Sequence, residues 1–185
     1  MKLSSIPNAI CILRILLVGP FVYALFQGAY PTALVLIFVA GLSDGVDGFL
    51  ARQFDWRSQL GSLLDPAADK LLVISAFLSL TSLGLVPLGL TLIVVLRDVV
   101  IVSGALAYRG LSGSLRGEPT FISKMNTACQ LLFIFLTIVN AQWQQPEAFW
   151  LISLGATVIF TSITSGLTYI LVWSRRAQEL VADKQ

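Results

Sequence analysis

Long apolar runs alternate with short polar connections along the whole chain of 185 residues. Each run is close to the roughly 20 residues that an α-helix needs to cross the hydrocarbon core of a bilayer. We therefore predict an all-α integral membrane protein with six transmembrane helices, forming a single membrane-embedded domain over residues 1–185. The predicted spans lie near residues 9–28, 32–51, 67–86, 88–108, 127–142 and 148–173.

The composition agrees with a membrane protein. Hydrophobic residues make up 56% of the chain and charged residues 12%, against roughly 25% charged in a soluble domain. The mean hydropathy is +0.84. The formal net charge is only +2, so the basic residues need no nucleic-acid partner to explain them, and the lipid bilayer is the expected environment.

The basic residues predict the orientation of the helices. Lys and Arg gather at the N-terminus, in the second and fourth connections and at the C-terminus, whereas the other three connections lack them. Since basic residues favour the cytoplasmic side, we expect both termini to be cytoplasmic. Arg14 interrupts the first apolar run, which argues against a cleaved signal peptide. The lack of a transit-like segment favours a bacterial cytoplasmic membrane.

Four aspartates lie near the cytoplasmic ends of the second and third predicted helices. Asp44 and Asp47 are three residues apart, which places them about 60° apart around a helix. Asp65 and Asp69 are four residues apart, or about 40°. The connection between the helices is short, so the helices are expected to be antiparallel neighbours whose carboxylates converge. Divalent cations such as Mg²⁺, Mn²⁺ or Ca²⁺ would offset the resulting repulsion, and they prefer oxygen ligands.

Small residues accompany the aspartates. Gly48 and Ala51 follow the first pair along the same helix, and Gly61 precedes the second pair, so a ligand or another backbone can come close. Pro66 suits the first turn of a helix, which would place Asp65 near an N-cap. A purely structural interpretation remains open at this point: aspartates that cap helices and glycines that pack them.

Taken together, these residues form a longer pattern. The spacing Asp44-x2-Asp47-Gly48-x2-Ala51-Arg52-x8-Gly61-x3-Asp65-x3-Asp69 resembles, at all eight specified positions, the signature of the CDP-alcohol phosphatidyltransferases. Asn8 and Arg14 also fall where the first helix of that family often carries an Asn-x2-Thr-x2-Arg pattern, with Cys11 in place of the threonine. The resemblance implies a six-helix membrane enzyme that is usually a homodimer.

The resemblance also implies a chemistry. A hydroxyl of an acceptor alcohol attacks the β-phosphorus of a CDP-linked lipid and displaces CMP, with two divalent cations, Mg²⁺ or Mn²⁺, at the pyrophosphate. Since the chain has no histidine, a carboxylate is the expected proton acceptor, and the resemblance implies that this carboxylate is Asp69. The implied metal ligands are Asp44, Asp47, Asp65 and Asp69. The implied contacts to the nucleotide and the CDP-lipid are Asn8, Gly48, Ala51, Arg52 and Gly61, and for Arg52 a plain positive-inside anchor stays open.

Two further polar clusters lie on the cytoplasmic side. Arg97 and Asp98 fall inside an apolar span, so they are expected to face the bundle interior or a headgroup cavity, with a structural ion pair as the alternative. The start of the fifth helix carries Arg116, Lys124 and Asn126. A basic group there can hold a phosphate of the acceptor, whereas snorkelling to anionic headgroups is the alternative for Lys124. The predicted acceptor-binding residues are Lys124, Asn126, Arg116 and Arg97.

The signature itself does not identify the acceptor. The family members that use glycerol-3-phosphate often carry Gly-Lys-x-Lys-Thr at the start of the fifth helix, with two lysines for a dianionic phosphate. Here the stretch reads Ser123-Lys124-Met125-Asn126-Thr127. One lysine suits the single charge of a phosphodiester, so we expect CDP-diacylglycerol and phosphatidylglycerol as substrates, with glycerol-3-phosphate as the alternative acceptor. A divalent-cation transporter is a remote alternative, because transport sites usually lie near the bilayer midplane.

Overall fold

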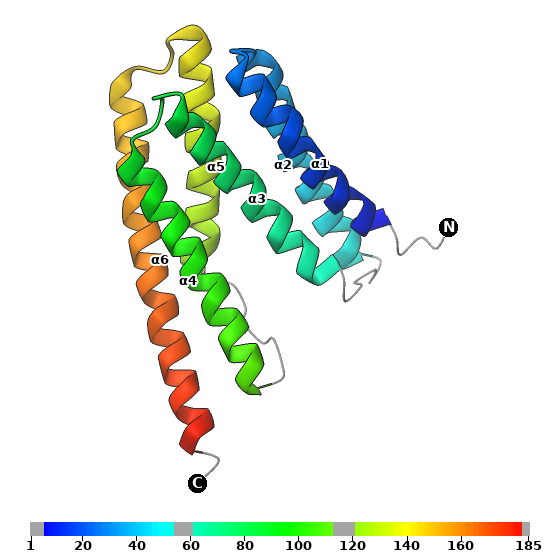
Figure 1. Ribbon diagram of the computed structural model, residues 1–185, viewed down its shortest axis with the longest axis vertical. Helices are drawn as coiled ribbons and strands as arrows, with labels where there is room; N and C mark the ends of the chain where they lie inside the picture. Colours follow the sequence, from blue (N-terminus) through cyan, green and yellow to red (C-terminus); the bar gives the residue numbers. More distant parts are fainter. Residues whose placement is uncertain (1–5, 54–60, 113–120, 183–185) are drawn as a thin grey trace. The chain divides into compact units, whose positions relative to one another are not determined.

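The computed structural model describes residues 6–53, 61–112 and 121–182, and within these ranges it gives only the backbone for residues 6–11, 44–53, 61–69, 105–112 and 173–182. Every regular element in the described ranges is a helix (Figure 1). The helices are α1 (Ile6–Phe26), α2 (Tyr30–Gln53), α3 (Gly61–Ser82), α4 (Leu88–Ser112), α5 (Phe121–Trp143) and α6 (Ala148–Ala182).

These helices coincide with the six predicted apolar spans, and most extend beyond them into polar sequence. The all-helical fold is therefore confirmed for the described residues. Among the residues with described side chains, two segments are long and apolar enough to cross a bilayer, Phe121–Trp143 and Ala148–Val172. Shorter apolar helical segments cover Ile12–Phe26, Tyr30–Ser43 and Lys70–Ser82. The count of six membrane spans and the orientation of the termini stay predictions.

The start of α3 differs from the prediction. The helix begins at Gly61, so Asp65 and Pro66 lie in its second turn, and the expected position of Asp65 near an N-cap is wrong. Pro66 lacks only the hydrogen bond that its N–H would have donated to the carbonyl of Ser62. The helix tolerates this loss close to its end, where a single turn precedes the proline. As a consequence, Asp65 and Asp69 belong to one continuous helix.

The chain divides into two compact units. The first unit contains residues Met1–Val86 and Ile134–Glu147. Within it α1 packs against both α2 and α3 (Figure 1). Each helix contributes one buried stripe with helical spacing. The buried apolar residues of the three helices are Phe21, Ala24 and Leu25 in α1; Ala33, Leu34, Ile37 and Ala40 in α2; and Leu72, Val73, Ala76, Phe77 and Leu80 in α3.

Glycine ends two helices of the first unit in the same way. Gly28 and Gly84 follow α1 and α3 and have φ values of 68° and 73°. The N–H of Gly28 donates to the carbonyl of Leu25, and the N–H of Ala29 donates to the carbonyl of Ala24. This pair of bonds is the Schellman motif, which needs a residue in the left-handed region and so favours glycine. Gly84 makes the equivalent bond to Thr81.

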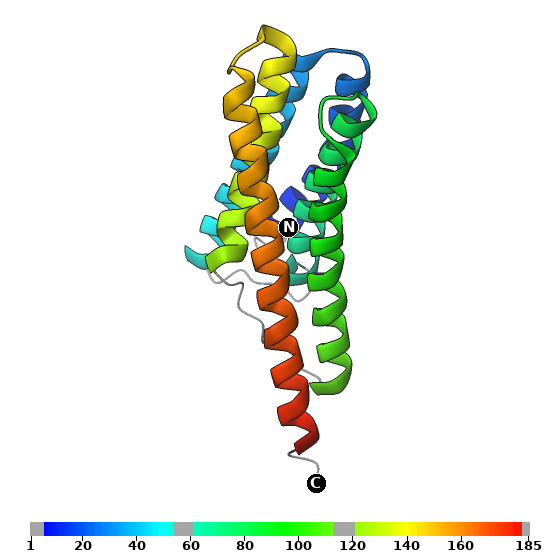
Figure 2. The same cartoon turned by 90° about the vertical axis from the view of Figure 1, so that its left-hand side faces the viewer.

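The second unit contains residues Pro87–Phe133 and Ala148–Gln185. Here α4 and α6 lie side by side, as two views at right angles show (Figures 1 and 2). The buried face of α6 is formed by small or polar residues more than by large apolar ones. Its members are Gly155, Val158, Ser162, Ser165, Gly166 and Tyr169. Such a face allows close approach between helices, which is typical of packing inside membranes.

Candidate active site

The residues of the aspartate signature lie on two helices of the first unit. Asp44, Asp47, Gly48, Ala51 and Arg52 belong to the last part of α2, and α3 begins at Gly61 and carries Asp65 and Asp69. Their side chains lie outside the described residues, as does that of Asn8 in α1. Arg116 lies outside the described chain altogether. The predicted convergence of the four carboxylates stays a prediction.

The helical register of the aspartates is part of the described structure. Asp44 and Asp47 lie in uninterrupted helix, and their spacing of three residues places them about 60° apart around the axis of α2. Asp65 and Asp69 also lie in uninterrupted helix, and their spacing of four residues places them about 40° apart around the axis of α3. All four are hard oxygen donors, the ligand type that Mg²⁺ and Mn²⁺ prefer, so the donor set fits such an ion. Among the residues with described side chains, no group of three or more His, Cys, Asp or Glu gathers elsewhere.

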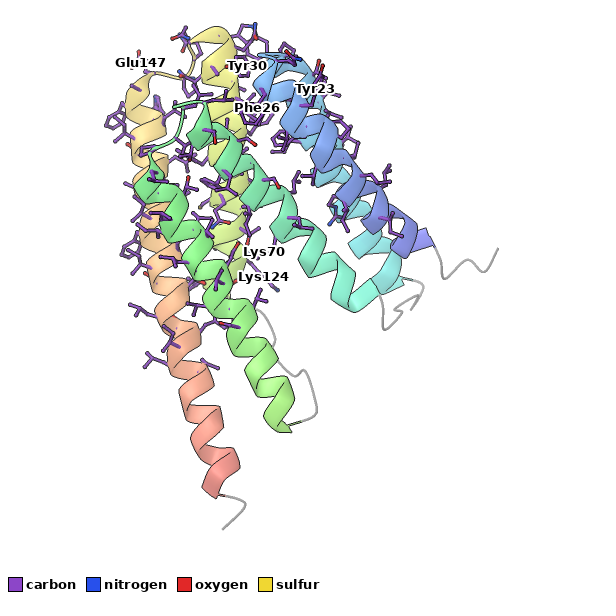
Figure 3. All side chains as sticks on the ribbon, viewed as in Figure 1. Tyr23, Phe26, Tyr30, Lys70, Lys124 and Glu147 are labelled. Atoms are coloured by element: carbon purple, nitrogen blue, oxygen red, sulfur yellow. The ribbon has the colours of Figure 1, made fainter. Side chains whose placement is uncertain are left out.

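Two basic residues within the helices of the first unit have described side chains, Arg14 and Lys70. Arg14 is 1% exposed and lies on the stripe of α1 that also carries Phe21 and Leu25. The guanidinium is therefore directed into the unit and not toward solvent or lipid. Lys70 directly follows Asp69 in α3 and is half-buried (Figure 3). Neither side chain lies on a free surface of its helix.

In the second unit, Arg97 and Asp98 lie in the middle of α4 and are 4% and 2% exposed. Arg97 Nη1 donates to Asp98 Oδ1 at 2.6 Å. Arg97 Nη2 donates to the hydroxyl of Ser123 in α5 at 2.5 Å and to that of Ser165 in α6 at 2.9 Å. The predicted interior position of both residues is confirmed. The ion pair joins neighbouring residues of one helix, and hydrogen bonds of Arg97 make the links to the other helices.

The start of α5 carries two of the predicted acceptor-binding residues. Lys124 is exposed in the first turn of α5 (Figure 3). Asn126, two residues further, is fully buried, and its Oδ1 accepts from Thr161 at 2.7 Å and from Ser162 at 2.9 Å. Gln130, one turn deeper, donates to Ser162 over 3.5 Å. Lys124 and Asn126 therefore face different surroundings, although both come from the same short stretch.

The hydroxyl residues that take part in these hydrogen bonds were not predicted from the sequence. Ser123, Thr161, Ser162 and Ser165 act as partners of Arg97, Asn126 or Gln130. Their spacing in α6 offered a signal, because Ser162 and Ser165 are three residues apart in an apolar helix and so share a face. Serine is common in membrane helices as a hydrogen-bond partner of the helix's own carbonyls, so the spacing alone could not reveal these contacts.

The helical fold, the long apolar segments and the paired aspartates of α2 and α3 are together typical of membrane-associated helical proteins. The sequence profile of the CDP-alcohol phosphatidyltransferases matches residues 4–171 of the chain. The chain therefore belongs to the CDP-alcohol phosphatidyltransferase family. Enzymes of this family are membrane-associated and generally use divalent cations.

Two kinds of relatives resemble the chain over most of its length. It is 32% identical to the human cardiolipin synthase (CMP-forming), over 97% of this chain, and 33% identical to a probable cardiolipin synthase (CMP-forming) of Drosophila melanogaster, over 92%. It spans 64% of the length of the human protein and 58% of the fly protein. A probable phosphatidylglycerophosphate synthase of Mycobacterium tuberculosis is 28% identical over 91% of this chain and 81% of its own length.

Proposed function

We propose that this protein transfers the phosphatidyl group of CDP-diacylglycerol to a hydroxyl of phosphatidylglycerol, which yields cardiolipin and CMP. The observation that carries the proposal is the similarity to cardiolipin synthases over nearly the whole chain, 32% identity over 97% of its residues for the human relative. The sequence at the start of α5 supports the same acceptor, because a single lysine suits a monoanionic phosphodiester.

Asp44, Asp47, Asp65 and Asp69 are the residues proposed to hold two divalent cations, Mg²⁺ or Mn²⁺. Cations bound there would neutralise the pyrophosphate and stabilise the negative charge that develops on the oxygens around the reacting phosphorus. The role of the two helices is positional: a continuous helical register keeps each pair of carboxylates on one side of its helix. A pre-formed cluster of this kind needs little reorganisation when the substrate binds.

Asp69 is the proposed general base. The acceptor hydroxyl loses its proton to this carboxylate while its oxygen forms a new bond to the β-phosphorus. The bond between that phosphorus and the bridging oxygen breaks, and CMP leaves with the electron pair of the broken bond. Around the nucleotide, we propose that Gly48, Ala51 and Gly61 leave room for the cytidine and pyrophosphate. Arg52 and Asn8 are the proposed hydrogen-bond partners.

The proposed acceptor site lies at the start of α5. Lys124 is exposed there and can reach a phosphodiester, and we propose that Arg116 adds a second cationic contact. Arg97 and Asn126 were predicted to join this site. Arg97 is buried and hydrogen-bonded to α5 and α6, and Asn126 is buried and hydrogen-bonded to α6. Contact with the acceptor therefore stays a prediction for both residues.

We further propose six membrane spans with both termini on the cytoplasmic side, a homodimeric assembly, and residence in a bacterial cytoplasmic membrane. The distribution of Lys and Arg supports the orientation, since the connections that follow α1, α3 and α5 carry neither. The match of bacterial relatives over most of their length is compatible with a bacterial membrane. The active site would then face the cytoplasm, where CMP is released.

Phosphatidylglycerophosphate synthesis is the second candidate function. It is supported by the similarity to the mycobacterial relative and to a CDP-diacylglycerol–glycerol-3-phosphate 3-phosphatidyltransferase of Pseudomonas fluorescens, which is 32% identical over 92% of this chain. The same carboxylates would serve either acceptor, so the first steps do not distinguish them. Membership of the transferase family leaves little support for a divalent-cation transporter.

A competition experiment tests the proposal. Purified protein in mixed micelles receives CDP-diacylglycerol, Mg²⁺ or Mn²⁺, and equal amounts of phosphatidylglycerol and glycerol-3-phosphate, and the lipid products are separated. We expect cardiolipin as the main product, with one CMP released for each molecule formed. If phosphatidylglycerophosphate is formed and cardiolipin is absent, the acceptor is glycerol-3-phosphate. If neither product appears, the transferase activity itself is contradicted.

A further inference from the structure

Arg97 has three hydrogen-bond partners among the described side chains of the second unit. It lies halfway along the apolar helix α4 and is 4% exposed, together with Asp98 at 2%. Charged groups at membrane depth are costly unless they are paired and hydrogen-bonded, so the chain maintains this pair against a large desolvation penalty. A residue of this kind requires an explanation beyond ordinary helix packing.

The contacts of Arg97 join three helices through one planar group. Nη1 is bonded to Asp98 at 2.6 Å within α4, and Nη2 carries two protons that reach two acceptors, Ser123 of α5 and Ser165 of α6. The guanidinium presents its donors in a fixed fork, so a bond at Nη1 sets the direction of the bonds at Nη2. Asp98 therefore orients the group that links α5 to α6.

The surroundings of Arg97 favour this single arrangement. Gly166 of α6 faces its aliphatic stem, since a Cβ placed on this glycine would lie 3.7 Å from Arg97 Cγ. One turn along the same two helices, Asn126 accepts hydrogen bonds from Thr161 and Ser162. The first two turns of α5 are thus linked to α6 twice, once through Arg97 and once directly by Asn126. Rotation of α5 about its own axis would break both sets of hydrogen bonds.

This constraint acts at a functionally important place. Ser123, the acceptor of the shorter Arg97 bond, directly precedes Lys124, the exposed residue proposed to hold the phosphate of the acceptor. A small rotation of the first turn of α5 would displace the long side chain of Lys124. Such a displacement would weaken binding of the acceptor, because a charge-assisted hydrogen bond needs a short distance and good alignment.

We infer that Arg97, held by Asp98, is a positioning residue that fixes the first turn of α5 through Ser123 and Ser165, and so directs Lys124 toward the acceptor. The inference rests on the proposed function, because it takes the start of α5 as part of the acceptor site. It assigns Arg97 a role through Lys124, with no direct contact to the lipid. Two of its three nitrogens are already bonded to protein side chains, and the side chain is buried.

Kinetic measurements on hydroxyl variants test this role. We expect Ser123→Ala to raise KM for the acceptor about tenfold, the value of one hydrogen bond to a charged group, while KM for CDP-diacylglycerol and kcat stay within about twofold. Ser123→Thr keeps the hydroxyl and is expected to restore the acceptor KM. Ser103→Ala is the matched control, because among the described residues the Ser103 hydroxyl donates to the Val100 carbonyl of its own helix and to no other helix.

A second arm uses Arg97→Lys, which keeps the charge and loses the fork. We expect the effect of Ser123→Ala on the acceptor KM to vanish in the Arg97→Lys background, because the contact is already lost there. If the two substitutions act additively, or if Ser123→Ala behaves like Ser103→Ala, the inference is overturned.

A geometric readout separates this inference from the proposed function. Lys124→Cys, in a chain with Cys11 and Cys129 replaced by Ala, is labelled with a soluble maleimide. We expect Ser123→Ala and Arg97→Lys each to change the labelling rate at least threefold, whereas Ser103→Ala leaves it unchanged. Unchanged labelling in both variants contradicts the positioning role. A wild-type protein that transfers phosphatidyl groups to neither acceptor contradicts the proposed function alone, since the labelling still decides the geometry.

Discussion

Arg97 and Asp98 show how the surroundings of single residues follow from the cost of burying a charge among apolar side chains. The position of both within an apolar run predicted that they face the interior, and the structure confirms this with exposures of 4% and 2%. Lys124, in the first turn of α5, is exposed, which is compatible both with the predicted contact to the acceptor and with the alternative of a side chain that reaches the headgroups. Charge and depth together decide which way such residues turn.

The aspartates of the signature give the first prediction. Asp47→Asn or Asp65→Asn should abolish transfer, because an amide is a weaker ligand for a hard cation than a carboxylate. The measurement is CMP release with Mg²⁺ or Mn²⁺ present, and again in excess EDTA. We expect no turnover in EDTA and recovery when the cation is restored. Full turnover without a free divalent cation would contradict the role given to the carboxylates.

Asp69 gives the second prediction, and it separates a base from a ligand. Asp69→Asn keeps the shape of the side chain but cannot accept the proton, so we expect the turnover number to fall by about 10² or more. Binding of CDP-diacylglycerol, measured by calorimetry with the cation present, should remain within a few-fold of the wild-type value. Joint loss of lipid and cation binding would show that Asp69 serves only as a metal ligand, and it would contradict the role of this carboxylate as the base.

Helix α6 shows how an element can be fitted to its neighbours by small residues. Its buried face carries glycines and serines, and a Cβ added to Gly155 would lie 3.2 Å from the ring of Phe133 and 3.3 Å from a methyl group of Leu90. Gly89, near the start of α4, is exposed and has nothing within 4 Å. Glycine is thus required for close approach at the first position and has no packing role at the second.

The third prediction compares these two glycines. Gly155→Leu should lower the free energy of unfolding by about 1–3 kcal/mol, because the added side chain must displace Phe133 and Leu90 from a packed contact. Gly89→Leu, the matched control, should change it by less than about 0.5 kcal/mol. Unfolding in detergent, followed by helical circular dichroism, provides the measurement. Equal effects of the two substitutions would show that α6 does not pack tightly at Gly155.

The arrangement of the whole chain across the membrane gives the fourth prediction. Single cysteines replace Gln27, Ser114 or Gln185 in a chain without Cys11 and Cys129. With intact cells, an impermeant maleimide should label only the Gln27→Cys variant, because that connection lacks basic residues and is expected outside. The other two variants should become reactive after permeabilisation. Labelling of Ser114→Cys in intact cells would reverse the proposed orientation.

The sequence alone determined the helices and the register of the signature. Apolar length and polar connections are local properties, so the six helical segments could be located without knowledge of their neighbours. The spacing of Asp44 and Asp47 likewise translates into an angle around a helix through the geometry of one turn. The beginning of α3 was misplaced, because Pro66 indicated a first turn while the helix continues one turn earlier to Gly61.

Only the tertiary structure decided which side chains meet. Arg97 bonds to Ser123, 26 positions away, and to Ser165, 68 positions away. Such pairs depend on the rotation and depth of separate helices, and many rotations bury a comparable apolar area in an apolar sequence. Asn126 illustrates the difference, since its sequence context did not indicate the hydrogen bonds that its Oδ1 accepts from Thr161 and Ser162 of α6. Local patterns define the helices, whereas hydrogen bonds between distant helices define their mutual orientation within a unit.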